Sequence, residues 1–93
     1  MTGTTRSSKN LDPRRRKILF RCWHRGIREM DIIMGEFADR HIDTLDDDQL
    51  DTLERILAVD DRDLIRWVTS EIEPPKEFDT PLFRAICAYE RSQ

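Results

Sequence analysis

The stretch Arg25-Gly26-Ile27-Arg28-Glu29 lies between two segments in which large apolar side chains recur every three or four residues. The segment before it carries Ile18, Leu19, Cys22 and Trp23, and the segment after it carries Ile27, Met30, Met34 and Phe37. That period is typical of helices that bury one face, so one helix ends and another begins near Gly26. A glycine there can take a positive φ that ends a helix, or can let a second backbone come close.

Opposed charges lie on both sides of Gly26. Glu29 follows Arg25 by four residues and falls near the start of the second helix, where the helix dipole favours a carboxylate. Arg28 and Asp31 add one charge of each sign. Two interpretations stay open: the glycine ends a helix among solvated side chains, or the charged cluster contacts another molecule.

Residues 25–29 resemble the R-G-x-x-E motif of the succinate dehydrogenase assembly factor 2 family. Its members are small helical proteins that promote covalent attachment of FAD to the flavoprotein subunit. The residues that match the motif and its usual hydrophobic-Asp continuation are Arg25, Gly26, Glu29, Met30 and Asp31.

A second similarity covers residues 57–67, which follow the family's pattern of a leucine helix, an acidic turn and Asp-Leu-x-x-Trp. Arg62 stands where many members carry proline, so the rigid start of the turn is lost while the acidic cap is kept. The resemblance as a whole extends over about residues 12–70, most of the chain. The order and spacing of the two signatures make the resemblance more specific than either motif alone.

The resemblance implies an assembly factor that is not itself an enzyme. Its partner would be the flavoprotein subunit of succinate dehydrogenase, with that of fumarate reductase as an alternative. It would hold no cofactor tightly and would act on FAD held by the partner. The residues expected to contact the partner are Arg25, Gly26, Glu29, Arg28 and Asp31. In these roles the glycine would allow close approach, Glu29 would accept a hydrogen bond, and Arg25 would orient a carboxylate or carbonyl of the partner.

Length and composition limit the alternatives. A chain of 93 residues fits one domain. Apolar and charged residues each make up 38% of it, which is typical of a soluble protein with a modest core. No apolar run approaches the ~20 residues that span a bilayer, and the first residues lack an apolar secretory segment. We therefore expect a monomer in a bacterial cytoplasm, with the mitochondrial matrix as the alternative location.

Enzymatic and metal-binding functions find little support in the residue types. The chain has no glycine-rich phosphate loop and no catalytic set around its two histidines, His24 and His41. Five short helices also leave little room for the ~300–1,000 Å³ cleft of a small-molecule site. Cys22 and Cys87 are expected to be buried free thiols, because two cysteines and two histidines without regular spacing do not form a zinc site. His24 alone is expected to be a surface or packing residue rather than a proton carrier.

Charge is distributed unevenly along the chain. Residues 1–28 contain nine Lys or Arg and one acidic residue, whereas residues 29–93 contain seven Lys or Arg and eighteen Asp or Glu. The run Arg14-Arg15-Arg16-Lys17 leaves a small protein-binding or nucleic-acid-binding regulator as the alternative function, and the resemblance implies that such a regulator would be antitoxin-like. The pI of about 5.3 is low for a nucleic-acid-binding domain, so we expect no nucleic-acid partner and only a solvated basic face.

The chain is predicted to be all-α, a compact five-helix bundle over residues 11–93 that follows a disordered tail at residues 1–10. Asp12-Pro13 starts the first helix, which ends near His24, and the second helix covers residues 27–40. Thr44 with Asp47 is expected to cap the third helix. Asp60 and Asp61 cap the fourth helix, Pro74-Pro75 stop it, and Thr80-Pro81 starts the fifth. The aromatic residues expected to anchor the core are Trp23, Phe37, Trp67 and Phe83.

Overall fold

The computed structural model describes residues 11–91, with side chains up to Tyr89. Within that range the chain forms five α-helices and one short 3₁₀ helix, in the order α1 (Pro13–Trp23), α2 (Arg28–His41), α3 (Asp47–Leu57), α4 (Asp61–Val68), η1 (Lys76–Phe78) and α5 (Pro81–Arg91). The predicted all-α bundle is confirmed for this part of the chain. The tail predicted at residues 1–10 lies outside the described residues.

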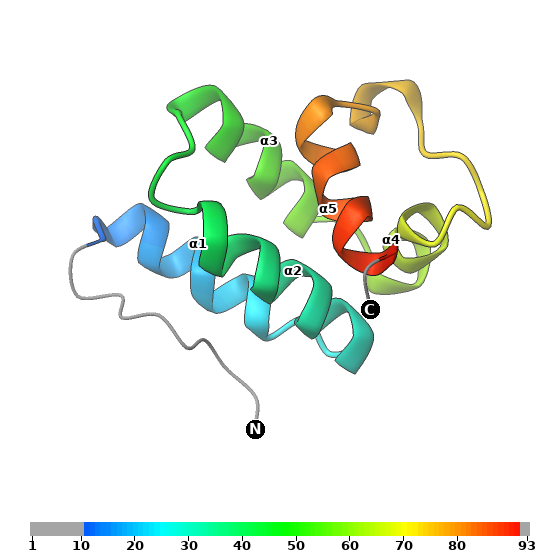
Figure 1. The fold of residues 1–93 in the computed structure, drawn as a ribbon, viewed down its shortest axis with the longest axis horizontal. Helices are drawn as coiled ribbons and strands as arrows, with labels where there is room; N and C mark the ends of the chain where they lie inside the picture. The colour runs from blue at the N-terminus through cyan, green and yellow to red at the C-terminus, as the bar shows by residue number, and fades with distance from the viewer. Residues whose placement is uncertain (1–10, 92–93) are drawn as a thin grey trace.

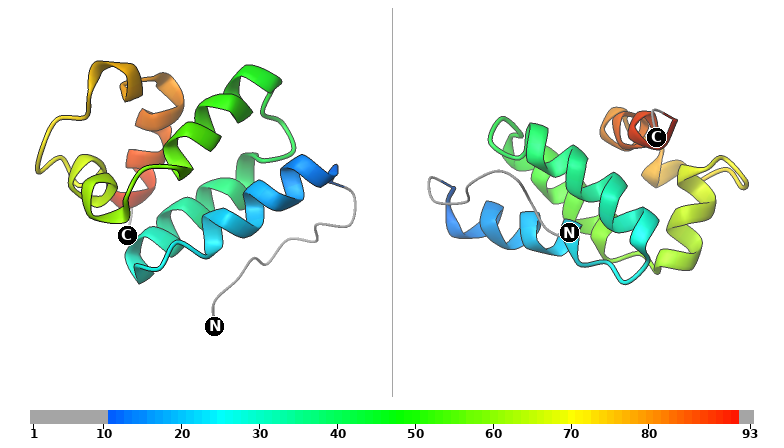
Figure 2. Two further views of the ribbon diagram at one scale, coloured as in Figure 1. Left: turned by 180° about the vertical axis from the view of Figure 1, so that it is seen from behind. Right: turned by 60° about the horizontal axis from the view of Figure 1, so that its bottom comes forward.

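Helices α1 and α2 lie side by side as an antiparallel pair joined by a short loop (Figure 1). Helix α3 packs against α1, α5 packs against both α2 and α3, and α4 packs against α5. The two further views show α1 on the outside of the bundle (Figure 2). Among the described residues, no helix is long and apolar enough to span a lipid bilayer.

The core draws apolar side chains from all five α-helices, and no polar or charged residue of the described chain is fully buried within it. Two of the four predicted anchors, Phe37 and Phe83, are almost completely buried. Trp23 and Trp67 are only partly buried and pack against the edge of the core. An indole ring is large and carries an N–H group, so it is often found at positions where part of the ring is exposed to solvent.

Trp23 packs directly on Gly35 of α2. A Cβ atom added at Gly35 would lie only 2.2 Å from Cδ2 of the Trp23 ring. The indole Nε1–H donates to Oδ1 of Asp39, one helical turn further on, at 3.1 Å. Glycine is therefore required at position 35 so that the ring can lie against the α2 backbone, a contact that the sequence did not predict.

Most predicted helix caps are confirmed. The Asp12 carboxylate accepts from the backbone N–H of Arg15 at 3.3 Å, with Pro13 as the first helical residue. Asp60 accepts from Arg62 N–H at 2.8 Å, and the Thr80 hydroxyl accepts from the N–H of residue 83 at 3.2 Å. Each cap satisfies an N–H group that has no partner within its own helix.

Two predictions about helix ends are wrong. Helix α3 is capped by Asp46 and Gln49, whose side chains bond reciprocally to each other's backbone N–H groups, while the Thr44 hydroxyl donates to the carbonyl of His41 at the end of α2. Helix α4 ends at Val68, before Pro74-Pro75 is reached. Ser70 takes a φ of 66°, and the backbone N–H groups of residues 70 and 71 close the helix on the carbonyls of residues 67 and 66.

Candidate functional site

The predicted motif covers the loop between α1 and α2 and the start of α2. Gly26 has a φ of 109°, in the region that L-residues rarely adopt. A Cβ atom at this position would lie 3.6 Å from Oδ2 of Asp61, an ordinary contact distance. The backbone conformation, rather than lack of space, therefore calls for glycine here. The residue that caps the C-terminus of α1 is His24.

Arg25 extends from this loop to the connection between α3 and α4. Its side chain is 10% exposed, and its Nε and Nη2 atoms both lie 2.8 Å from Oδ1 of Asp61. Nη2 also donates to the carbonyl of Val59 at 2.6 Å, and Nη1 donates to the carbonyl of Leu57. The guanidinium thus binds carbonyls at the end of α3, where the helix dipole is negative, and a carboxylate at the start of α4, where the dipole is positive. Arg25 ties three elements together.

Asp31 closes the loop from the other side. Its Oδ1 atom accepts hydrogen bonds from the backbone N–H groups of Arg25, at 2.5 Å, and of Gly26, at 3.3 Å. Two successive N–H groups that point at one anion form a nest for it. Asp31 therefore fixes the loop backbone against the first turns of α2.

Arg28 and Glu29 behave differently from these residues. Both side chains are exposed at the start of α2, and neither forms an ion pair or side-chain hydrogen bond with any residue that the structure describes. The charged residues of this region thus form two groups. Arg25 and Asp31 hold the loop in place, whereas Arg28 and Glu29 face solvent. The sequence located the motif but did not distinguish these two groups.

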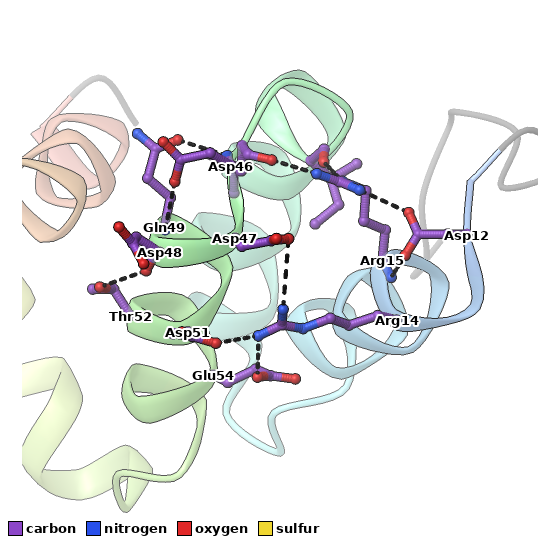
Figure 3. A network of polar contacts seen from close by, with 12 residues as sticks. Asp12, Arg14, Arg15, Asp46, Asp47, Asp48, Gln49, Asp51, Thr52 and Glu54 are labelled. Atoms are coloured by element: carbon purple, nitrogen blue, oxygen red, sulfur yellow. Dashed lines mark hydrogen bonds and ion pairs between the residues drawn. The ribbon is translucent and has the colours of Figure 1, made fainter.

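The basic run of α1 is divided in a similar way (Figure 3). Arg14 reaches carboxylates of α3, with Nη2 at 2.5 Å from Asp51 and at 2.8 Å from Glu54. The hydrogen bond to Glu54, followed by that to Asp51, raises the pKa of the Arg14 guanidinium above its usual range. Arg15 binds Asp12 at 2.8 Å and the carbonyls of residues 42 and 45. Arg14 and Arg15 therefore bind groups within the protein. Only Arg16 and Lys17 of the run are left to contact another molecule.

Both histidines contact neighbouring aromatic side chains. The His24 ring stacks on Phe20 with 4.0 Å between ring centroids, and its Nδ1 lies 2.8 Å from the Phe20 carbonyl. His41 contacts the Tyr89 hydroxyl through Nε2 at 3.1 Å. Among the described residues there is no group of three or more His, Cys, Asp or Glu suited to hold a metal ion.

Both cysteines are buried free thiols, as predicted. Burial raises the pKa of the Cys22 thiol to about 12, so it stays protonated at neutral pH and is a poor nucleophile.

A hollow of about 640 Å³ lies along α3. Its lining consists of residues from α3 and Ala58 and includes Asp48, Asp51 and Glu54, with no residue of the motif. Its volume falls in the range of small-molecule sites, but the lining comes from one helix and its end, whereas small-molecule sites are clefts that bury most of the ligand surface. The hollow therefore gives no support for a flavin site within this chain.

These features define a small helical protein that presents exposed charged side chains at the start of α2, next to a loop held by Arg25 and Asp31. Residues 16–90 match the protein family described as the flavinator of succinate dehydrogenase, and the chain belongs to that family. The relationship predicted from residues 25–31 and 57–67 is thereby confirmed, whereas the comparisons do not support the antitoxin-like alternative.

Individual relatives agree with this assignment. The chain is 39% identical over 77 residues to the FAD assembly factor SdhE of Acetobacter pasteurianus, a match that covers 83% of this chain and 71% of that protein. It is 30% identical over 76 residues to the mitochondrial succinate dehydrogenase assembly factor 2 of Dictyostelium discoideum, covering 82% and 54%. For the protein of the same name from Meyerozyma guilliermondii, identity is 33% over 72 residues, covering 77% and 50%. The chain thus spans about half the length of these two mitochondrial relatives.

Proposed function

We propose that this protein binds the flavoprotein subunit of succinate dehydrogenase and promotes covalent attachment of FAD to it. The observation that carries the proposal is the family match over residues 16–90. The flavoprotein subunit of fumarate reductase is a second candidate for the same surface. Location in a bacterial cytoplasm, or in a mitochondrial matrix, stays a prediction, since the relatives include a bacterial protein and proteins named as mitochondrial.

Binding alone is sufficient for such a role. A factor that binds one conformation of its partner better than another shifts the partner towards that conformation. If the favoured conformation holds the flavin and its attachment residue close together, the gain in proximity accelerates bond formation. The bond-forming chemistry then stays with the flavin and the partner, and this chain contributes no catalytic group and no flavin site of its own.

Within the motif, we assign the contact to the two exposed side chains. Glu29 accepts hydrogen bonds or an ion pair from the partner, and Arg28 pairs with a carboxylate or carbonyl. Gly26 allows the partner's backbone to come close to the loop. Arg25 and Asp31 act as positioning residues, because their polar atoms already bind Asp61 and the loop backbone. This assignment is supported by exposure and hydrogen bonding.

The proposal predicts a faster flavinylation reaction in a purified system. Flavoprotein subunit without covalent flavin is incubated with FAD, with this protein or with an equal mass of serum albumin, and covalent flavin is measured by in-gel fluorescence after denaturation. We expect the rate to rise and to saturate with added protein, since about 1.4 kcal/mol of stabilisation of the reactive conformation gives a tenfold faster reaction. Equal rates with this protein and with albumin would contradict the proposed function.

A further inference from the structure

Phe20 is an unusual residue on the surface of α1. Its side chain is 62% exposed, and the only other large hydrophobic side chain exposed in the described part of the chain is Ile72, at 47%. The neighbouring residues Ile18 and Leu19 are almost fully buried, so Phe20 lies on the opposite, outer side of a helix whose apolar face is already packed. The Phe20 side chain is therefore not stabilised by burial in the core of the protein.

The Phe20 ring is held in place although it is exposed. His24 follows it by one helical turn, and the two rings are nearly parallel, with an interplanar angle of 15° and 4.0 Å between centroids. The contact between His24 Nδ1 and the Phe20 carbonyl fixes the imidazole. A partner that covers this stack therefore loses little side-chain entropy on binding, because the rings are already ordered.

Positive charge without an internal partner surrounds the stack. Arg16 and Lys17 precede Phe20 by four and three residues, so all three lie on the same side of α1. Both cations are exposed, and neither forms an ion pair with the described residues, in contrast to Arg14, which is bound to carboxylates of α3. Uncompensated charge of one sign attracts a segment of the opposite sign and orients it as it approaches.

We propose that Arg16, Lys17, Phe20 and His24, here called the α1 outer face, form a docking surface for an acidic segment of the flavoprotein that carries one apolar side chain. The apolar side chain covers the aromatic stack, and carboxylates on either side pair with Arg16 and Lys17. This inference rests on the proposed function, since it extends the contact with the same partner. The α1 outer face leads directly into the motif loop, because His24 precedes Arg25, and α1 lies on the outside of the bundle (Figure 2). The partner would thus be held along α1 as well as at Arg28 and Glu29.

A protein segment fits this surface better than a nucleic acid does. Only part of the basic run is unpaired, because Arg14 and Arg15 bind groups of the chain itself, so few of its cations are left for the phosphate contacts on which nucleic-acid affinity depends. A second copy of this chain is an occupant that the test must exclude, because its acidic α3 has the complementary charge. Both are distinguished from the flavoprotein by the experiment below.

The inference is tested with two variants, each with a matched control. Phe20→Ala is compared with Ile72→Ala, which also truncates an exposed hydrophobic side chain, and Lys17→Glu is compared with Arg55→Glu, a reversal of another exposed charge. The dissociation constant for the purified flavoprotein subunit is measured by calorimetry, with urea unfolding as the check on folding. We expect Phe20→Ala to weaken binding about tenfold or more and Lys17→Glu to weaken binding and reduce its salt dependence. Both controls should bind as the wild type does.

The outcomes separate this inference from the proposed function. If the wild type binds and stimulates flavinylation but Phe20→Ala binds with unchanged affinity, the docking surface is wrong and the proposed function stands. A wild type that does not bind the flavoprotein overturns both. If Phe20→Ala abolishes only self-association, measured by analytical ultracentrifugation, or only binding to a single-stranded oligonucleotide, the assigned occupant is wrong.

Discussion

Replacing Arg25 by alanine is expected to lower the free energy of unfolding by up to about 3–5 kcal/mol, the usual loss when one partner of a buried ion pair is removed, because this pair is almost buried. The Asp61 side chain, which is 13% exposed, would lose its guanidinium, and the carbonyls of Leu57 and Val59 would lose their donors. Small domains are stable by only about 5–15 kcal/mol, so the loss is large. The measurement is urea unfolding followed by circular dichroism.

Arg62→Ala provides the matched control. The Arg62 side chain is 85% exposed and lies 3.5 Å from Asp60, so its removal should change the free energy of unfolding by less than about 0.5 kcal/mol. The combined variant Arg25→Ala/Asp61→Ala should lose less than the sum of the two single variants, because each removes the same contact. A variant Arg25→Ala that unfolds like the wild type would show that this arginine does not hold the three elements together.

Replacing Gly35 by alanine is expected to lower the free energy of unfolding by about 1–3 kcal/mol, the usual cost of an extra methyl group in a tightly packed site. The new Cβ would overlap the Trp23 ring at 2.2 Å, so the indole must move and its bond to Asp39 must break. On an exposed helix the same change would instead gain up to about 1 kcal/mol from helix propensity. Urea unfolding gives the energy, and tryptophan fluorescence reports the displaced ring.

The background variant Trp23→Leu tests the cause of that loss. With a smaller side chain at position 23, Gly35→Ala should become neutral or slightly stabilising, because only the propensity of alanine remains. If Gly35→Ala lowers the free energy of unfolding equally in the wild type and in Trp23→Leu, the indole ring is not the group with which the new methyl group clashes.

Features encoded by neighbouring residues could be predicted from the sequence. The caps at Asp12, Asp60 and Thr80 and the existence of each α-helix depend on residues within one or two turns. The end of α4 was missed because Ser70 takes the positive φ that glycine usually provides. The cap of α3 was misassigned because Thr44 and Asp46 both suit such a position, and only the structure shows that the Thr44 hydroxyl is used by α2.

Contacts between distant residues could not be predicted in this way. The motif at residues 25–29 is recognised from its order of residue types, but the internal role of Arg25 depends on Asp61, which is 36 residues away in the sequence. The close approach of Trp23 to Gly35 depends likewise on the packing of α1 against α2. A single sequence does not show that Arg25 contacts Asp61 or that Trp23 contacts Gly35.

The measurement that tests the central claim most directly is the affinity of Glu29→Ala for the flavoprotein subunit, taken together with its free energy of unfolding. If the motif presents Glu29 in the first turn of α2, next to a loop held by Arg25 and Asp31, the free energy of unfolding should change by less than about 1 kcal/mol, the usual value of a carboxylate near a helix N-terminus. The affinity should fall at least about tenfold, as for a truncated interfacial charge. Glu73→Ala, at another exposed glutamate, should bind like the wild type. Wild-type affinity in a folded Glu29→Ala would contradict the account.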